Sequence, residues 1–393
     1  MKKIVFVVLA VLAMSVIWII EPVSYNPFGK LPPPLNKSVG DYTCLSGDPT
    51  NGSQVTNNVN TLVDNAISSN KFLGVSTGIL REGCGSYVVA SGYSSKRDAT
   101  AFTPETINRV ASISKPMTAI AIMQLVEKGL IDLDAPIQNY LTNYPKQAQT
   151  AITVRHLLNH TSGIAHYSSK LDALSFSHYA TLNDAIEEIL NRDVIAQPGK
   201  RYQYSSFGYT VLGAIVERVS KLSFEQYLRL NIWDKAGMQH TSLERSFEQQ
   251  INGQPNKSRL YLKINSTYVR APYNDLSIIS PAGGVQSNLG DLLKFGQAVL
   301  NNNLISRESL LQMIDVQDSM APAFGDDAYG LGWNVYNHDK YGRIIAHSGA
   351  QPGASTYLRI YLDKGVVSAT LSNAFGTKSS SYELTNNVAR LVL

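Results

Sequence analysis

The chain has 393 residues, of which 44% are hydrophobic and only 16% are charged. Charged residues fall below the roughly 25% typical of globular proteins, which excludes an acidic or basic disordered chain. The net charge is only +4, and no block of like charges occurs, so nucleic-acid binding has no electrostatic support. At about 150 residues per domain, the length suggests two or three domains or one large enzyme fold with two layers.

The amino end has the pattern of an export signal. Two lysines precede residues 4–20, which are apolar except for Ser15. This segment would be about 26 Å long as a helix, near the short end of what spans a bilayer, and no small-residue cleavage site follows it. We expect an uncleaved inner-membrane anchor that places the rest of the chain in the periplasm. A cleaved signal and secretion to the periplasm are the alternative.

The chain has two cysteines, Cys44 and Cys84. Outside the cytoplasm such a pair favours a disulfide, which is worth roughly 4 kcal/mol by loop entropy at this separation. Two buried free thiols are the alternative.

Three segments are predicted along the chain. Residues 1–20 form the signal or anchor. Residues 21–61 are rich in Pro, Asn, Gly and Ser without a regular period, which is typical of a stalk. Residues 62–393 form one domain, and a short helix is expected over 60–69.

Strand patterns lie at both ends of this domain and helical patterns lie between them. We therefore expect an α+β fold, with one antiparallel sheet built from the N- and C-terminal segments, helices on its faces and an inserted helical subdomain. The expected strands are 72–80 and 86–91, then 332–336, 343–347, 356–362 and 366–372; helices dominate 112–302, and an amphipathic stretch covers 380–393.

Ser112 and Lys115 form an S-x-x-K tetrad, a weak signal alone because a second match occurs at 68–71. Residues 116–126 are apolar almost all round, which predicts a buried helix that ends near Gly129. Ser112 would lie at the start of this helix, where free N–H groups stabilise negative charge. Burial would lower the pKa of Lys115 and let it act as a base. A capping serine beside a solvent-directed lysine is the alternative.

Two further segments carry groups suited to proton transfer or substrate binding. Tyr204 could act as a proton shuttle if adjacent cations lower the pKa of its phenol, and a core or surface tyrosine is the alternative. His347 ends a strand pattern before a glycine-rich turn through Gly353. A strand edge beside a nucleophile can lend a backbone N–H to an oxyanion hole, and a structural histidine is the alternative.

Two other enzyme classes are disfavoured. His156 and His160 have the spacing of a zinc pair, but Leu157 stands where a metalloprotease needs its carboxylate base. No G-x-S-x-G elbow occurs, because Tyr204 stands where the first glycine around Ser206 would be. We therefore expect neither a metalloprotease nor an α/β-hydrolase, and the predicted chemistry needs no metal or cofactor.

Six motifs resemble the serine β-lactamase and penicillin-binding-protein family, in its class C-like branch. They occur in the order found in that family, and the resemblance spans roughly residues 62–393. The motifs are V-A-S-I-S-K at 110–115, I-T-V-R-H-L-L-N-H-T-S-G-I at 152–164, Y-S-S-F-G-Y at 204–209, P-A-G-G-V-Q-S at 281–287, Y-G-L-G-W at 329–333 and H-S-G at 347–349.

The resemblance implies roles for these residues. Ser112 would be the acylated nucleophile, and Lys115 and Tyr204 would share the proton transfers. The N–H groups of Ser112 and Ala350 would form the oxyanion hole. The residues implied to contact the substrate or its oxyanion are Ser206, His347, Ser348, Gly349 and Ala350.

This sequence departs from the family at two positions. Ser206 replaces an asparagine whose amide would bind substrate and orient Lys115. His347 replaces a lysine, and an imidazole with a pKa near 6.5 is a less dependable cation for a substrate carboxylate. Both changes weaken the case for efficient β-lactam hydrolysis, and neither affects acylation of Ser112.

We therefore expect an envelope serine hydrolase that cleaves an amide or ester through a Ser112 acyl-enzyme. A small peptide of the D-Ala-D-Ala type is the first choice of substrate, with an ester or a β-lactam as other partners. The alternatives are a carboxylesterase of the same fold and a catalytically weak, membrane-tethered binding or scaffolding protein.

Overall fold

The computed structural model describes residues 36–44, 51–142, 151–169, 174–190, 192–244, 256–316 and 328–393. The predicted anchor at 1–20 and part of the predicted stalk lie outside these ranges. Within them, no helix combines the length and the apolar character needed to cross a bilayer.

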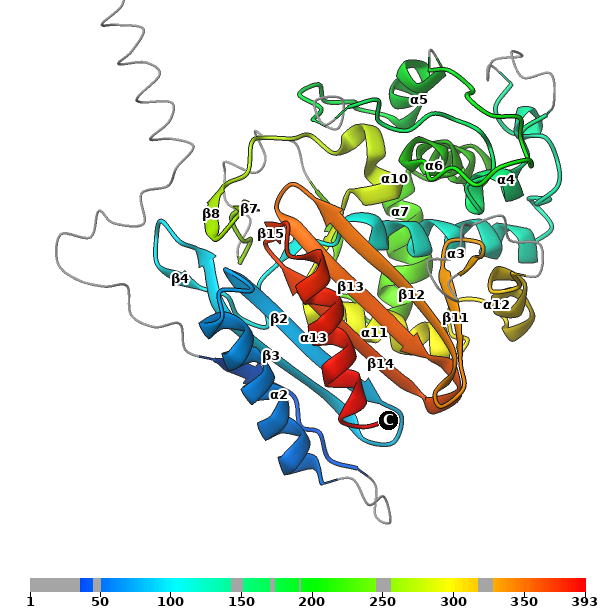
Figure 1. Ribbon diagram of the computed structural model, residues 1–393. Coiled ribbons are helices and arrows are strands. Elements are labelled where there is room, and N and C mark those ends of the chain that lie inside the picture. Colours follow the sequence, from blue (N-terminus) through cyan, green and yellow to red (C-terminus); the bar gives the residue numbers. More distant parts are fainter. Residues whose placement is uncertain are drawn as a thin grey trace, which may run out of the picture.

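An antiparallel sheet forms the centre of the fold (Figure 1). Its strand order is β1-β3-β2-β14-β13-β12-β11-β10, with β4 paired to β3. Strand β2 pairs with β14, so that Leu80 lies opposite Val367. The two ends of the domain therefore share one sheet, which confirms the predicted fold class. The strands are β1 Lys37–Val39, β2 Gly74–Arg81, β3 Gly85–Ser95, β4 Thr100–Ala101, β10 Ala328–Tyr329, β11 Asn334–His338, β12 Gly342–Gln351, β13 Ala354–Tyr361 and β14 Val366–Ser372.

Helices cover both faces of this sheet. On one face, α2 (Gly52–Ser68) packs on β3, and α13 (Lys378–Arg390) packs on β13 and β14 (Figure 1). Val59 and Val388 belong to the buried cluster under these two helices. On the other face, α11 (Leu289–Leu300) packs on β2 and β14 and belongs to the main core. The sheet is thus the middle layer of a sandwich.

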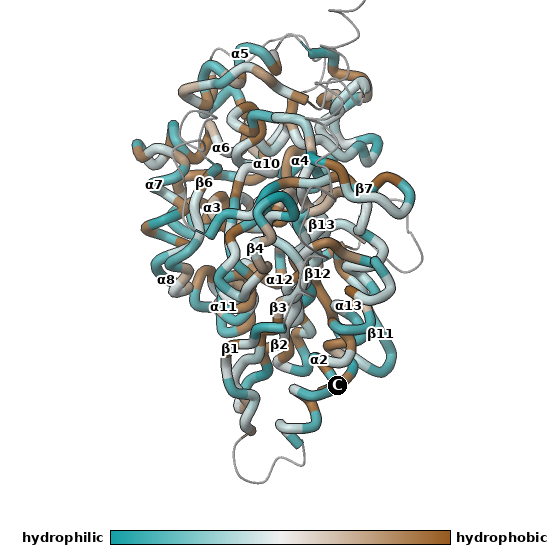
Figure 2. The backbone as a smooth tube through the Cα atoms, turned by 90° about the vertical axis from the view of Figure 1, so that its left-hand side faces the viewer, coloured by the Kyte–Doolittle hydropathy of each residue, from teal (hydrophilic) through white to brown (hydrophobic). Residues whose placement is uncertain are grey.

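A helical subdomain lies at one end of the molecule, above the sheet (Figure 2). Its elements are inserted between the N-terminal and C-terminal strands, as predicted. The remaining helices and turns are η1 Ala111–Ile113, α3 Ser114–Glu127, η2 Ile137–Asn139, α4 Val154–Leu158, α5 Leu182–Leu190, α6 Ser206–Ser220, α7 Phe224–Leu228, the π-helical η3 Arg229–Trp233, α8 Asp234–Ala236, η4 Ser277–Ile279, α10 Ser280–Gly283, α12 Arg307–Met313 and η5 Leu362–Lys364.

The middle of the chain is less helical than the sequence predicts. Strands β6 to β9 lie there and belong to two small sheets with strand orders β15-β7-β8 and β5-β9-β6, whose strands β5 and β15 come from outside this region. These strands are too short to show a recognisable alternation of polar and apolar residues in the sequence. They are β5 Asn108–Arg109, β6 Ser242–Leu243, β7 Tyr261–Ile264, β8 Thr267–Arg270, β9 Val285–Ser287 and β15 Ala374–Phe375.

The first helix begins earlier than expected. It covers Gly52–Ser68, whereas the sequence pattern predicts a helix over 60–69 after a stalk. Asn51 caps it by accepting a hydrogen bond from the Gln54 N–H at 3.1 Å. Its buried face includes Val55, Val59 and Val63, which are four residues apart and lie on one side of a helix. The many asparagines and threonines between these valines hide this stripe in the sequence.

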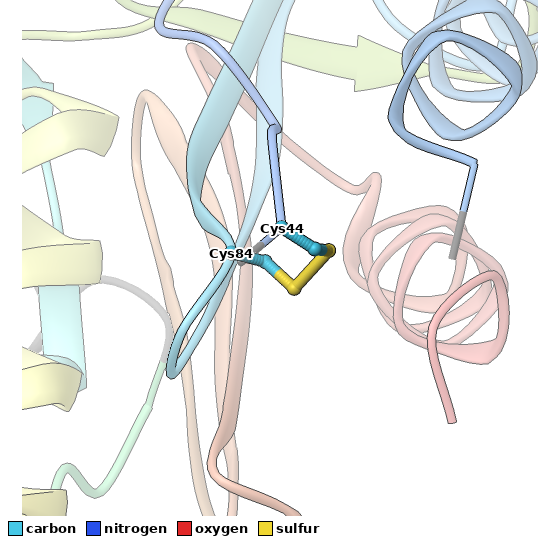
Figure 3. Close-up of a disulfide and its surroundings, with 2 residues drawn as sticks. All are labelled: Cys44 and Cys84. Carbon is cyan, nitrogen blue, oxygen red and sulfur yellow. A yellow bond between two sulfur atoms is a disulfide. The ribbon is translucent and has the colours of Figure 1, made fainter. Parts of the chain in front are cut away.

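A disulfide joins Cys44 to Cys84, as the sequence predicts (Figure 3). Cys84 lies in the turn between β2 and β3, and Cys44 follows strand β1. The bond therefore ties the segment before α2 to the edge of the central sheet.

Candidate active site

Ser112 lies in the short 3-10 turn η1, immediately before the buried helix α3. Ala111 has a φ of 51°, in the left-handed region that costs a residue with a Cβ atom about 1–3 kcal/mol. The side chains of Ala111 and Ile113 are fully buried, whereas Ser112 is half-buried. The turn thus buries the neighbours of Ser112 and leaves Ser112 itself partly exposed.

Lys115 is fully buried in the first turn of α3, and its Nζ contacts three oxygens. Nζ is 3.1 Å from Ser112 Oγ, 3.2 Å from Ser206 Oγ and 3.0 Å from the carbonyl oxygen of Ala282. Burial lowers the pKa of Lys115 well below that of an ordinary lysine. In its neutral form, which the lowered pKa favours, the amine can donate its two N–H groups to Ala282 and Ser206. Its lone pair then remains for the hydroxyl proton of Ser112.

Tyr204 also hydrogen-bonds to Ser112, and Lys115 Nζ lies 4.8 Å from the centroid of its ring. Burial raises the pKa of Tyr204 above that of an ordinary tyrosine, and the hydrogen bond to Ser112 offsets this only in part. The lowered phenol pKa that the sequence interpretation required is therefore not found, because the effect of burial on the pKa of Tyr204 outweighs that of its hydrogen bond to Ser112. Tyr204 keeps its proton at neutral pH and can donate it.

Side chains fix the N-terminus of α6, which directly follows Tyr204. The backbone N–H of Ser205 donates to His160 Nδ1 at 3.2 Å, and that of Ser206 donates to His166 Nδ1 at 3.3 Å. These bonds satisfy donors that a helix start leaves unpaired. Although its side chain is shorter than the family's asparagine, Ser206 still reaches Lys115 in this arrangement.

His160 packs directly against Tyr204, with ring centroids 4.3 Å apart. Its ring also lies 4.9 Å from that of Tyr329 and is fully buried. Burial lowers the pKa of His160 well below its usual value, so the ring is neutral and its Nε2 carries the proton. Because the sequence singles out His160 only by its zinc-like spacing, this contact was missed. The available signal was its place inside the motif at 152–164.

His156 lies apart from this packing and has a local role. Its Nδ1 accepts a hydrogen bond from the Thr153 N–H at 3.2 Å, as part of the capping box of α4.

His347 lies on β12 with both ring nitrogens bonded inside the protein. Nδ1 lies 2.8 Å from the carbonyl oxygen of Ser348 and must therefore donate, which leaves Nε2 to accept from the Tyr329 hydroxyl at 3.0 Å. Burial lowers the pKa of His347 to about 3. The buried imidazole is therefore neutral at physiological pH and supplies no cation for a substrate carboxylate.

Gly349 brings β12 against the turn that holds Ser112. A Cβ atom at this position would lie 2.3 Å from the Val110 carbonyl oxygen and 3.2 Å from the Ser112 nitrogen. Only a glycine permits this close approach. Ala350 follows on the same strand and is exposed. The predicted oxyanion donors, the N–H groups of Ser112 and Ala350, thus belong to two segments in direct contact.

A half-buried serine beside a buried lysine with a lowered pKa and a protonated tyrosine, on this sheet-and-helix fold, is typical of serine hydrolases that work through an acyl-enzyme. Residues 59–392 match the family model described as Beta-lactamase. The chain belongs to this family and is a serine hydrolase.

Known proteins of related sequence and structure agree with this assignment. Penicillin-binding protein 4* of Bacillus subtilis (strain 168) is 29% identical over 300 residues, which cover 72% of this chain and 64% of that protein, less than two thirds of its length. The mitochondrial serine beta-lactamase-like protein LACTB of Homo sapiens is 26% identical over 391 residues, covering 76% of this chain and 70% of that protein.

The D-amino acid amidase of Ochrobactrum anthropi SV3, solved with D-phenylalanine, shares the fold. Its TM-score is 0.75 at 22% identity, over 86% of this chain and 99% of that chain.

Proposed function

We propose that this serine hydrolase cleaves a small peptide or related amide through an acyl-enzyme on Ser112. The observation that carries the proposal is the contact of Lys115 Nζ, in an amine whose pKa is lowered by burial, with Ser112 Oγ at 3.1 Å. An amine at this distance can take the hydroxyl proton as a general base.

In the acylation step, Ser112 Oγ attacks the carbonyl carbon of the substrate as its proton passes to Lys115. Tyr204 gives its phenol proton to the leaving group when the bond to the carbonyl carbon breaks. The Lys115 ammonium formed in the attack lies 4.8 Å from the centre of the Tyr204 ring and stabilises the phenolate. This charge pair exists only after the attack, so it favours the transition state over the resting enzyme.

Deacylation reverses the roles of the two bases. The Tyr204 phenolate takes a proton from water, whose oxygen attacks the acyl carbon. When the bond to Ser112 breaks, Lys115 returns its proton to Ser112 Oγ. Both bases are then restored, and the net reaction consumes one water.

The neutral His347 supports a substrate whose leaving side carries no carboxylate. A free carboxylate placed near this buried imidazole would lose hydration without gaining a cation there. The amidase that shares the fold acts, by its name, on an amide of a D-amino acid. We therefore favour a peptide or amino-acid amide over a peptide with a free C-terminus.

A comparison of three substrates tests this proposal. The same acetylated D-Ala-D-Ala dipeptide is offered with a free and with an amidated C-terminus, beside a p-nitrophenyl ester. We expect kcat/KM for the amidated peptide to exceed that for the free acid by about 10-fold or more. Ester turnover without cleavage of either peptide would overturn the amidase proposal and identify a carboxylesterase.

The proposed location of the enzyme is the cell envelope, on the periplasmic side of the inner membrane. The apolar segment at 4–20 and the disulfide between Cys44 and Cys84 support it. Fractionation of the full chain beside a version that begins at residue 21 tests anchoring. Recovery of both proteins in the soluble fraction would exclude an anchor.

A further inference from the structure

A buried ionic cluster lies next to the active site and takes no part in the proposed proton transfers. The side chains of Arg109 and Glu244 are each 2% exposed, and Lys257 beside them is 11% exposed. Burial would raise the pKa of Glu244, but Arg109 and Lys257 lower it to about 2, so the carboxylate is charged. Burying three charged groups is costly unless each is well paired. The hydrogen bonds of these charged groups therefore show which segments of the chain the cluster connects.

The guanidinium of Arg109 uses its donors on three different segments. Nε donates to Glu244 Oε2 at 2.9 Å, Nη1 to the Pro352 carbonyl at 2.8 Å, and Nη2 to the Asn274 carbonyl at 2.9 Å. Nη2 also donates to Glu244. A planar fork of fixed donors can bind all these acceptors at once, whereas a lysine ammonium cannot reproduce this geometry.

Arg109 itself, Pro352 and Glu244 each lie close in the chain or by a hydrogen bond to a segment of the active site. Arg109 lies on β5, three residues before Ser112. Pro352 lies in the turn between β12 and β13, directly after the strand that carries Gly349 and Ala350. Glu244 donates its backbone N–H to the Gly284 carbonyl at 2.8 Å, just after the helix α10 that contains Ala282.

The neighbouring Asn108 holds the same turn. Its Nδ2 donates to the Gly353 carbonyl at 3.3 Å and to the Ser372 carbonyl at 2.9 Å. Its Oδ1 accepts from the Ser258 hydroxyl at 2.6 Å. Two consecutive side chains of β5 therefore bind two consecutive carbonyl groups of the turn that follows the predicted oxyanion strand.

We propose that Arg109 is a positioning residue, which holds the turn at Pro352 so that the Gly349–Ala350 backbone stays aligned with the Ser112 N–H. The inference rests on the proposed acyl-enzyme at Ser112. It assigns Arg109 an effect on the alignment of oxyanion donors, in addition to its contribution to stability. Misplacement of a reacting group by about 1 Å can lower a rate about 100-fold.

The variant Arg109→Lys tests this role, because it keeps a cation beside Glu244 and loses the bonds to Pro352 and Asn274. On a p-nitrophenyl ester we expect kcat to fall about 100-fold, with KM within about 3-fold of the wild type. The affinity for an arylboronic acid, a mimic of the tetrahedral intermediate, should fall in parallel with kcat/KM. A purely structural role would lower the melting temperature without this parallel loss.

Lys257→Gln is the matched control, because it removes the other cation beside Glu244 without touching the turn. It is expected to keep kcat within about 2-fold of the wild type. If Arg109→Lys does not fold, Asn108→Ala tests the same turn and should lower kcat about 10-fold. A folded Arg109→Lys variant with wild-type kcat and boronate affinity overturns the inference. If that variant does not fold, the same result for Asn108→Ala overturns it. An inactive wild type would instead overturn the proposed function.

Discussion

Lys115→Met is expected to slow the acylation of Ser112 about 1,000-fold while the protein remains folded. Methionine has a similar length but no lone pair of sufficient basicity, so the Ser112 proton has no acceptor at 3.1 Å. Single-turnover labelling with a chromogenic ester measures this rate directly. Lys128→Met, at the exposed end of α3, is the matched control and should acylate at the wild-type rate. Wild-type acylation by Lys115→Met would exclude Lys115 as the base.

The same residue sets the pH dependence of activity and of stability. Acylation should fall as the pH drops through the lowered pKa of Lys115, because the amine then holds a proton already. The unfolded chain binds this proton up to a higher pH, so wild-type stability rises with pH between the folded and unfolded pKa values. In Lys115→Met the free energy of unfolding should lack this dependence on pH, which is at most about 1.4 kcal/mol per pH unit.

His347→Asn should show the same loss of activity at low pH as the wild type, because the pKa of His347 is about 3 and this residue does not titrate in that range.

Gly349→Ala should lower kcat about 100- to 1,000-fold, the loss that follows removal of one oxyanion donor. The added methyl group would lie 2.3 Å from the Val110 carbonyl oxygen, so β12 must move away from the Ser112 turn. The effect should fall on kcat and on boronate affinity more than on KM.

Gly290→Ala is the control for this glycine substitution. A Cβ atom there would meet only the Asn288 side chain, at 3.6 Å. Wild-type activity is therefore expected. If Gly349→Ala is as active as Gly290→Ala, the close approach of β12 to Ser112 has no part in catalysis.

Local patterns were sufficient to single out the candidate nucleophile and its candidate base. Ser112 and Lys115 stood out because the helix that follows them is apolar on all sides, which requires burial and hence a lowered lysine pKa. The central sheet was also predictable from local patterns, because its C-terminal strands have long runs of residues that favour β-structure. The helix over Gly52–Ser68 was predicted too short, because polar residues separate its buried valines.

Tertiary contacts decided the features that were not predicted. The pKa shifts of Tyr204 and His347 depend on burial by segments far away in sequence, which the residues next to them in the chain do not reveal. The contacts of His160 with Tyr204 and of Arg109 with Pro352 join residues separated by whole elements. The spacing of residues within a single motif cannot indicate such long-range contacts.

Labelling of the full chain with a fluorophosphonate, followed by intact-mass and peptide analysis, tests the central claim most directly. The proposed mechanism predicts one phosphonyl group per chain, attached to Ser112 and absent in Ser112→Ala, with labelling slowed in Lys115→Met. No adduct on the folded wild-type protein, or an equal adduct on Ser112→Ala, would contradict it.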